Sequence, residues 1–332
     1  MTVSTLPIRA RALELADAGQ LPAYVYDLGE LDKHMAVIRY AMSDIEVYYA
    51  VKANPDPKLM EVIAPYVQGF EIASGGELAH VREHFPGSRI AIGGPGKTDA
   101  ELFADVYRLH IESPSEIRRL FMAGRSADVL LRVNLDIPIK GASLAMGGGA
   151  TPFGMDPTGV AECLDMLKGQ DAVRLRGIHA HLASGMDAPT MLELASAILD
   201  YARSLGVTEV NIGGGMAVSY ADPASRFDWQ TYGAGLTALR RPGETLRIEP
   251  GRSISVYCLK RHHPAGGTDP RHVRRLPTGQ PPFNRATSSR NLRTRASNSA
   301  REAASRPSAS TSRSTVSGVG RRCPVSIREI VG

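Results

Sequence analysis

The sequence predicts an α/β protein built on a (β/α)8 TIM barrel, and two observations lead to this fold class. Between residues 46 and 252, short runs rich in β-branched and aromatic residues alternate with amphipathic helical segments. Eight strand-like runs occur in this stretch, with helical segments between them. Eight alternating units favour a closed barrel over an open doubly wound sheet.

The expected elements follow one another in a regular order. The strands are EVYYAVKAN (46–54), GFEIAS (69–74), RIAIGG (89–94), LHIESP (109–114), VLLRVNL (129–135), LRGIHAHLAS (175–184), EVNIGGG (209–215) and TLRIEPGR (245–252). The helical segments include PKLMEVIAPYV (57–67), GELAHVREHF (76–85), DAELFADVYRL (99–109), PSEIRRLFMAG (114–124) and APTMLELASAILDYARSLG (188–206). An earlier strand, AYVYDL (23–28), precedes this pattern. We expect it to belong to a second domain built from both ends of the chain.

Composition bounds the class of protein. A chain of 332 residues that is 43% hydrophobic can form one large domain or two ordinary ones. Its three cysteines lie far apart without a CxxC pair, which indicates a reducing compartment and no disulfide framework. No signal-peptide core and no membrane-length apolar run is found in the sequence. We therefore expect a cytoplasmic protein without a membrane partner.

The net charge of +5 averages two unlike pieces of chain. Residues 259–332 contain fourteen Arg and one Lys against three acidic residues, a balance of +12, so residues 1–258 carry −7. The basic piece is rich in Ser, Arg and Pro and has one aromatic residue, Phe283, so it cannot bury enough surface to fold alone. The expected division is an N-terminal segment and strand (1–28), a barrel (29–252), the start of a C-terminal β-domain (253–258) and a disordered tail (259–332).

Unusual residues fall repeatedly where the expected strands end. Active sites of such barrels lie at the C-terminal ends of the strands, so several polar residues that converge there predict a site. The candidates are Lys52, Glu71, Arg132, His179, His181, Gly213, Gly214, Gly215, Glu249 and Arg252.

These residue types match the chemistry of one cofactor. A lysine in a semi-enclosed site can form a Schiff base with an aldehyde. Glycines 213–215 offer free backbone N–H groups to a phosphate, and Arg252 adds a positive charge. His181 can stack on a flat ring, while Glu249 can keep a ring nitrogen protonated. An aldehyde, a phosphate, a flat ring and a protonated nitrogen together describe pyridoxal 5′-phosphate.

Five motifs carry a resemblance to a known family. YAVKAN (49–54), GFEIASGGEL (69–78), GIHAHLASG (177–185), NIGGG (211–215) and EPGR (249–252) occur in the order found in fold-type III pyridoxal-phosphate-dependent decarboxylases. The chain resembles this family from about residue 22 to residue 256. The resemblance implies a barrel of the alanine-racemase type followed by a β-domain, in a protein that forms homodimers.

The resemblance also implies roles for individual residues. Lys52 would be the Schiff-base lysine, with His181 stacked on the cofactor ring and Glu249 on the pyridine nitrogen. Ser184, glycines 213–215 and Arg252 would surround the phosphate. Glu71 takes the place of the family's acidic residue beside the stacking histidine, and Arg132 lies in the fifth strand near the site.

The carboxylate at Glu249 favours decarboxylation over racemisation. A negative charge on the pyridine nitrogen deepens the electron sink, whereas alanine racemases of this fold usually place an arginine there. The stretch NIGGGMAVSYADPASRFDW (211–229) most resembles the branch of siderophore biosynthesis, which acts on amino-acid conjugates. Diaminopimelate or ornithine decarboxylation is the alternative.

Two readings from other classes stay open. A metal-dependent barrel hydrolase would use the pair His179 and His181, and it needs further ligands at other strand ends, where His110 is the one histidine available. It would leave the glycine and lysine motifs unexplained, so we expect no metal site. A truncated pseudoenzyme without activity is the other reading.

The chain departs from the family after residue 258. The family continues into a β-domain that supplies a cysteine motif and a tyrosine across a dimer interface. Here no tyrosine follows Tyr257, and RRCP around Cys323 does not match that motif, so activity and dimer formation of this chain are in question. We expect residues 259–332 to be a frameshift product rather than a nucleic-acid-binding tail.

Overall fold

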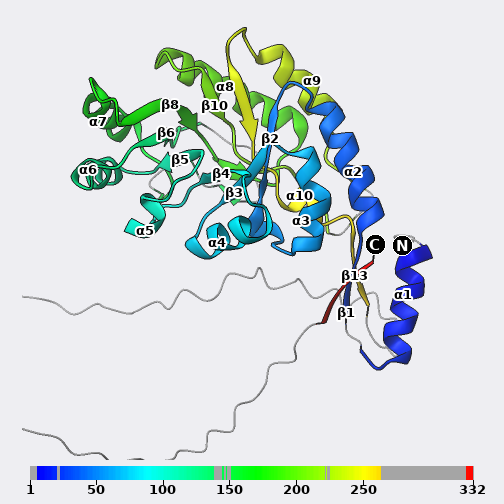
Figure 1. Cartoon of the computed structure of the whole chain (residues 1–332). Helices are drawn as coiled ribbons and strands as arrows, with labels where there is room; N and C mark the ends of the chain where they lie inside the picture. Colours follow the sequence, from blue (N-terminus) through cyan, green and yellow to red (C-terminus); the bar gives the residue numbers. More distant parts are fainter. Residues whose placement is uncertain are drawn as a thin grey trace, which may run out of the picture. The chain divides into compact units, whose positions relative to one another are not determined.

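The computed structural model describes residues 6–20, 23–137, 144–145, 147, 151–220, 222, 225–262 and 327–331. Eight parallel strands close into a barrel (Figure 1), which confirms the predicted fold class, and each contains part of one predicted strand. In barrel order they are β10 (Glu209–Asn211), β11 (Thr245–Ile248), β2 (Glu46–Ala50), β3 (Gly69–Ile72), β4 (Arg89–Ile92), β5 (Arg108–Ile111), β6 (Ala127–Arg132) and β8 (Val173–His179).

Helices other than the first surround the barrel strands, and most helices begin at a side chain that caps the first turn. Asp27, Ser74 and Asp187, for example, each accept a hydrogen bond from the backbone N–H three residues later. The helices are α1 (Leu6–Asp17), α2 (Leu28–Ala41), α3 (Pro57–Ile63), α4 (Gly75–His84), α5 (Asp99–Leu102), α6 (Pro114–Met122), α7 (Pro157–Leu167), α8 (Ala188–Ser204), α9 (Trp229–Leu239) and α10 (Arg252–Ser255), with 3₁₀ turns η1 (Val51–Ala53) and η2 (Ala64–Tyr66).

Two predicted elements differ from the structure. The helix expected over residues 99–109 ends at Leu102, because residues 108–111 pair with strands β4 and β6 instead. The first barrel strand ends at Ala50, so Lys52 lies in η1 rather than at a strand end. In the first case pairing within the barrel overrides a local preference, and in the second the pairing of β2 with β3 stops at Ala50.

A small sheet lies outside the barrel. Strand β1 (Ala23–Asp27) pairs antiparallel with β12 (Leu259–His262) and parallel with β13 (Ile327–Val331), so segments from both parts of the chain meet in this sheet. Both partners fall within the range expected to be disordered. They satisfy the backbone hydrogen-bonding groups on both edges of β1, which would otherwise need other partners. Residues 263–326 lie outside the described residues.

An antiparallel pair, β7 (Leu144–Ala145) with β9 (Ala183–Ser184), lies near the C-terminal ends of the barrel strands.

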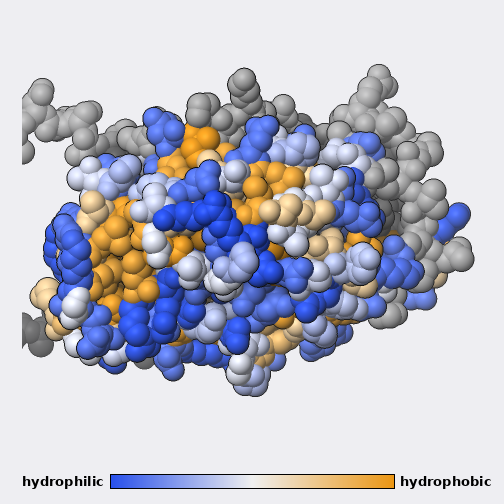
Figure 2. Space-filling view, turned by 90° about the horizontal axis from the view of Figure 1, so that it is seen from above, coloured by the Kyte–Doolittle hydropathy of each residue, from blue (hydrophilic) through white to orange (hydrophobic). Residues whose placement is uncertain are grey.

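Large exposed apolar side chains are scattered over the described surface, at Leu13, Val37, Tyr40, Met122 and Tyr220. On the side of the molecule drawn in the space-filling view, hydrophobic patches alternate with hydrophilic ones (Figure 2). No described helix has the length and apolar composition needed to cross a bilayer.

Charged side chains close the N-terminal end of the barrel. Arg247, which is fully buried, donates from Nη1 to Glu209 (2.8 Å) and from Nε to Glu46 (2.9 Å), and it stacks on Tyr48. Arg108 holds the other side of the Glu209 carboxylate at 2.7–3.0 Å. The cluster fills the base of the barrel, so the polar residues above it face the C-terminal end.

Candidate active site

The predicted Schiff-base lysine forms an ion pair at the mouth of the barrel. Lys52 Nζ donates to Glu71 Oε2, which comes from the neighbouring strand β3. Glu71 is buried, whereas about half of the Lys52 side chain is exposed. The pair therefore has one partner fixed in the barrel and one that reaches into the opening.

The two charges perturb each other. Burial lowers the pKa of Lys52, but the carboxylate of Glu71, followed by that of Glu249, raises it by more, so the net pKa lies above its ordinary value. Burial raises the pKa of Glu71, and the ammonium of Lys52 offsets this only in part. The raised pKa of Lys52 and the raised pKa of Glu71 both favour a proton held in the hydrogen bond between Nζ and Oε2.

His181 lies over the glycine run that follows strand β10. Its Nδ1 accepts a hydrogen bond from the backbone N–H of Gly214 at 3.3 Å. A Cβ added to Gly213 would stand 2.8 Å from His181 Cβ, so only glycine admits the ring in this place. Burial, followed by the charge of Lys52, lowers the pKa of His181 to about 3, and the ring is neutral. Its Nε2 is buried without a hydrogen-bond partner among the described residues.

The other two glycines press against backbone. A Cβ on Gly214 would lie 2.6 Å from the carbonyl oxygen of Glu249, and one on Gly215 would lie 2.3 Å from that of Ala183. Gly215 also accepts a hydrogen bond from Gly185 N at 2.8 Å, which brings it next to the buried Ser184. The rim is therefore made of backbone here, and no side chain projects from the run into the opening.

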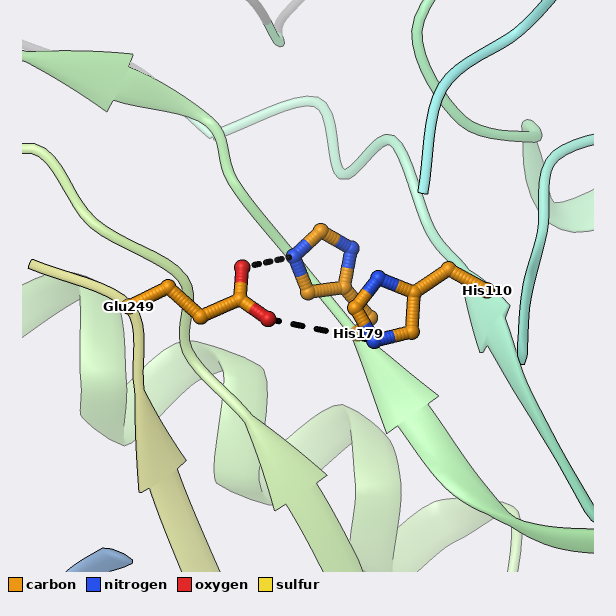
Figure 3. A group of neighbouring side chains, drawn as sticks. All are labelled: His110, His179 and Glu249. Carbon is orange, nitrogen blue, oxygen red and sulfur yellow. Dashed lines mark hydrogen bonds and ion pairs between the residues drawn. The ribbon is translucent and has the colours of Figure 1, made fainter. Parts of the chain in front are cut away.

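Glu249 is the centre of a buried polar group (Figure 3). Its Oε1 accepts from Asn211 Nδ2 at 2.6 Å, and its Oε2 lies 3.2 Å from His179 Nε2. The ring of His110 stacks on that of His179, with centroids 4.2 Å apart and planes 12° from parallel. Burial lowers the pKa of both histidines well below the ordinary value, so both rings are neutral.

Arg132 and Arg252 occupy different surroundings. Arg132 Nη1 donates to Glu112 Oε1 at 2.7 Å, and this buried pair lies at the ends of strands β5 and β6. Arg252 begins α10 and is exposed. The preceding Gly251 packs closely on Ala53 of η1, so Arg252 starts beside the turn that carries Lys52.

Sequence reasoning gave little weight to His110, and it missed Asn211 and Glu112. A signal for them exists, because alternate residues of a strand point to one side. Arg108, His110 and Glu112 alternate along β5 and its end, and the structure pairs Arg108 and His110 with groups inside the barrel. That register would have brought His110 toward the ends of the other strands.

The metal-site alternative is not favoured by this geometry. The described histidines and acids that come together are His110, His179 and Glu249, whose ligand atoms lie within 4.8 Å of one another, rather than His179 with His181. Since the two rings are stacked nearly parallel, their lone pairs run side by side. Ligand lone pairs of a tetrahedral metal site must instead converge on one point.

Comparisons with known proteins agree with the motifs. The model of the pyridoxal-binding domain of pyridoxal-dependent decarboxylases matches residues 28–256. A 2-[(L-alanin-3-ylcarbamoyl)methyl]-2-hydroxybutanedioate decarboxylase from Staphylococcus aureus is 34% identical over 254 residues, covering 70% of this chain and 64% of that protein. A diaminopimelate decarboxylase from Bacteroides thetaiotaomicron is 30% identical over 263 residues, covering 72% and 68%.

Solved structures show the same fold. A diaminopimelate decarboxylase mutant from Helicobacter pylori, crystallised with L-lysine, has a TM-score of 0.64 at 24% identity over 73% of this chain and 66% of that one. The chain belongs to the pyridoxal-dependent decarboxylases, as the motifs predicted. It spans 64% of the length of the Staphylococcus aureus relative.

The residues at the barrel mouth fit the cofactor of this family, pyridoxal 5′-phosphate. An amine, a buried carboxylate and a flat neutral ring lie around one opening, at Lys52, Glu249 and His181. The glycine run packs so closely on His181 and on neighbouring backbone that no side chain can extend from it. His181 Nε2 adds a buried polar atom that has no hydrogen-bond partner among the described residues.

Proposed function

We propose that this protein catalyses the pyridoxal-phosphate-dependent decarboxylation of an amino acid or amino-acid conjugate. The observation that carries the proposal is the pairing of Lys52 with Glu71 at the same barrel mouth as the buried carboxylate of Glu249. An amine for an aldehyde and an anion for a ring nitrogen are the two groups that this chemistry requires of the protein.

The proposed roles follow the geometry. Lys52 Nζ would hold the cofactor by its aldehyde carbon, and His181 would lie against one face of its ring. The N–H groups of Gly213 and Gly214 donate to Asn211 Oδ1 and His181 Nδ1, so they are not free as the sequence predicted. We propose that the phosphate lies along this glycine run, where the N–H of Gly215, the hydroxyl of Ser184 and the positive charge of Arg252 would bind it. Arg132 would act on the site through its charge. That charge lowers the pKa of His181, as burial and the charge of Lys52 do to a larger extent.

The proton of Lys52 has a defined destination. An ammonium is not a nucleophile, so Lys52 must lose a proton before its amine can react. Glu71 Oε2 is its hydrogen-bond acceptor, and burial raises the pKa of that carboxyl. Glu71 would take the proton from Nζ and return it when the amine is released.

Glu249 would choose the type of reaction. When bound, the cofactor ring withdraws the electron pair that remains as carbon dioxide leaves, and it does so best with its nitrogen protonated. A buried anion beside that nitrogen keeps the proton there. An electron sink of this depth favours decarboxylation over racemisation.

For the substrate, we propose a carboxylated amino-acid conjugate of the kind named for the Staphylococcus aureus relative, within siderophore biosynthesis. Diaminopimelate, named for the Bacteroides relative, is the second candidate, followed by ornithine. The family likeness further supports a homodimer, and three distant cysteines without a CxxC pair support a reducing, cytoplasmic location.

The test is direct. The purified full-length chain, loaded with pyridoxal phosphate, is offered each candidate substrate, and carbon dioxide release is followed in a coupled assay. Turnover of the conjugate above that of diaminopimelate and ornithine is expected. Pyridoxal phosphate binding without turnover of any amino acid would identify an inactive relative instead, and absence of binding would refute the proposal.

A further inference from the structure

The cluster around Glu249 contains more groups than the proposed reaction uses. A single carboxylate beside the ring nitrogen would suffice for that role. In the structure, side chains from three strands gather on it. His179 from β8 and His110 from β5 are drawn in Figure 3, and Asn211 from β10 also binds the carboxylate. All four residues are buried, at 4% exposure or less.

We propose that Asn211 and His179 are positioning residues, which orient the Glu249 carboxylate toward the cofactor's ring nitrogen. This inference rests on the proposed function. The two donors bind different oxygens, with Asn211 at 2.6 Å from Oε1 and His179 at 3.2 Å from Oε2. A carboxylate held at both oxygens cannot rotate about its terminal bond without losing a hydrogen bond.

The protonation states support donation to the carboxylate. A carboxylate accepts, so His179 must carry its proton on Nε2, the atom that faces Glu249. His179 Nδ1 is buried and has no hydrogen-bond partner among the described residues, so nothing there competes for the proton. The ring of His110 lies flat against that of His179, and two charged rings 4.2 Å apart would repel each other. Two neutral rings leave the negative charge on Glu249.

His110 has a different part in the cluster. Its Nε2 lies 3.8 Å from Glu249 Oε1, beyond hydrogen-bond range. It acts as a flat backing that fixes the plane of the His179 ring. Gly93 makes room for it, because a Cβ there would lie 3.1 Å from His110 Nδ1.

Without the hydrogen bonds from Asn211 and His179, the Glu249 carboxylate could rotate toward a second cation, the ammonium of Lys52. The carboxylate already raises the pKa of Lys52, after Glu71. A carboxylate free to rotate toward the amine would stabilise the ammonium and abandon the ring nitrogen. Asn211 is itself fixed, because its Oδ1 accepts from the backbone N–H of Gly213 at 3.0 Å. One asparagine thus ties the position of Glu249 to the glycine run.

The variants separate hydrogen bonding from packing. His179→Phe keeps a stacked ring and removes the donor, whereas His179→Gln keeps an N–H donor near the position of Nε2. Asn211→Asp keeps the acceptor for Gly213 N and replaces the donor to Glu249 with a second negative charge. His110→Phe is the matched control, since it makes the same ring substitution on the partner that does not bind the carboxylate.

Two readouts other than activity apply to the full-length chain. One is the dissociation constant for pyridoxal phosphate, and the other is the ¹⁵N chemical shift of its labelled ring nitrogen at pH 8, which reports protonation. We expect His179→Phe and Asn211→Asp to bind about tenfold more weakly and to shift the nitrogen signal toward the unprotonated form. His179→Gln and His110→Phe should keep the protonated signal. Circular dichroism melts confirm that each variant folds.

Different outcomes overturn different claims. If His179→Phe and Asn211→Asp keep both the protonated signal and an affinity within twofold of the unmodified protein, the positioning role is wrong. One equivalent of tightly bound zinc, lost in both His110→Phe and His179→Phe, would make the cluster a metal site instead. If Glu249→Gln itself keeps the protonated signal, the proposed role of Glu249 fails before that of its donors.

Discussion

Replacement of Glu249 by glutamine isolates the effect of its charge. The amide has the shape of the carboxylate, and its oxygen can still accept from Asn211. Its NH2 group would then face His179 Nε2, and this neutral ring can move its proton to Nδ1, which has no partner among the described residues. Both hydrogen bonds therefore survive by a change of tautomer, and we expect the free energy of unfolding to change by less than about 1 kcal/mol.

Activity should respond far more strongly. A hydrogen bond to a charged group is worth up to about 3 kcal/mol, and its loss at the ring nitrogen slows the reaction roughly 100-fold. The assay measures kcat for carbon dioxide release by the loaded enzyme, with saturating pyridoxal phosphate and the melting temperature as control. A variant with the same melting temperature and a kcat within threefold of the unmodified enzyme would refute the assignment of Glu249 to the electron sink.

Three further predictions concern the barrel and the chain. Glu209→Gln should destabilise the fold by about 1.5–3 kcal/mol at pH 7, because two buried arginines lose their shared anion while Arg247 keeps Glu46 and Arg108 keeps Asp128. Burial raises the pKa of Glu209, but its arginine partners lower it by more, so the net pKa lies below its ordinary value. The stabilisation is therefore present above the unfolded pKa and lost as the pH falls through the folded pKa. Urea unfolding from pH 7 to pH 3 should show a flatter pH dependence in the variant, and equal slopes would contradict this. Gly214→Ala should weaken pyridoxal phosphate binding at least about tenfold, because the added Cβ would lie 2.6 Å from a backbone oxygen. Gly96→Ala is the control, since the space around Gly96 is open, and this variant should bind pyridoxal phosphate normally in the same titration. The DNA, read in another frame from about codon 258, should encode alternating apolar strands with a cysteine motif and a late tyrosine; two frames without such strands would make the basic tail genuine.

The barrel and its mouth follow from local sequence signals. Each strand-like run is bounded by glycine, proline or capping residues, and the motif residues Lys52 and Glu249 lie within one to two residues of a strand end. Because parallel strands end on the same face, their position along the chain predicts that they meet. The early end of α5 and the strand at residues 259–262 were not predicted, since pairing with distant strands decides both.

The contacts among the site residues depended on closure of the barrel. Asn211 lies in a motif whose glycines drew attention, and nothing local shows that its side chain binds Glu249. The stacking of His110 on His179 joins β5 to β8, strands that flank β6 on either side. Contacts of this kind depend on the stagger and register of the strands around the barrel. The periodicity of a single strand gives no information about either.

The central claim is that Lys52 is the residue that binds the cofactor. The full-length chain is incubated with pyridoxal phosphate, reduced with borohydride, digested and analysed by mass spectrometry. We predict one pyridoxyl-phosphate label per chain, on the peptide that contains Lys52, and loss of the label in Lys52→Ala. Label on a different lysine, or undiminished label in Lys52→Ala, would contradict the claim.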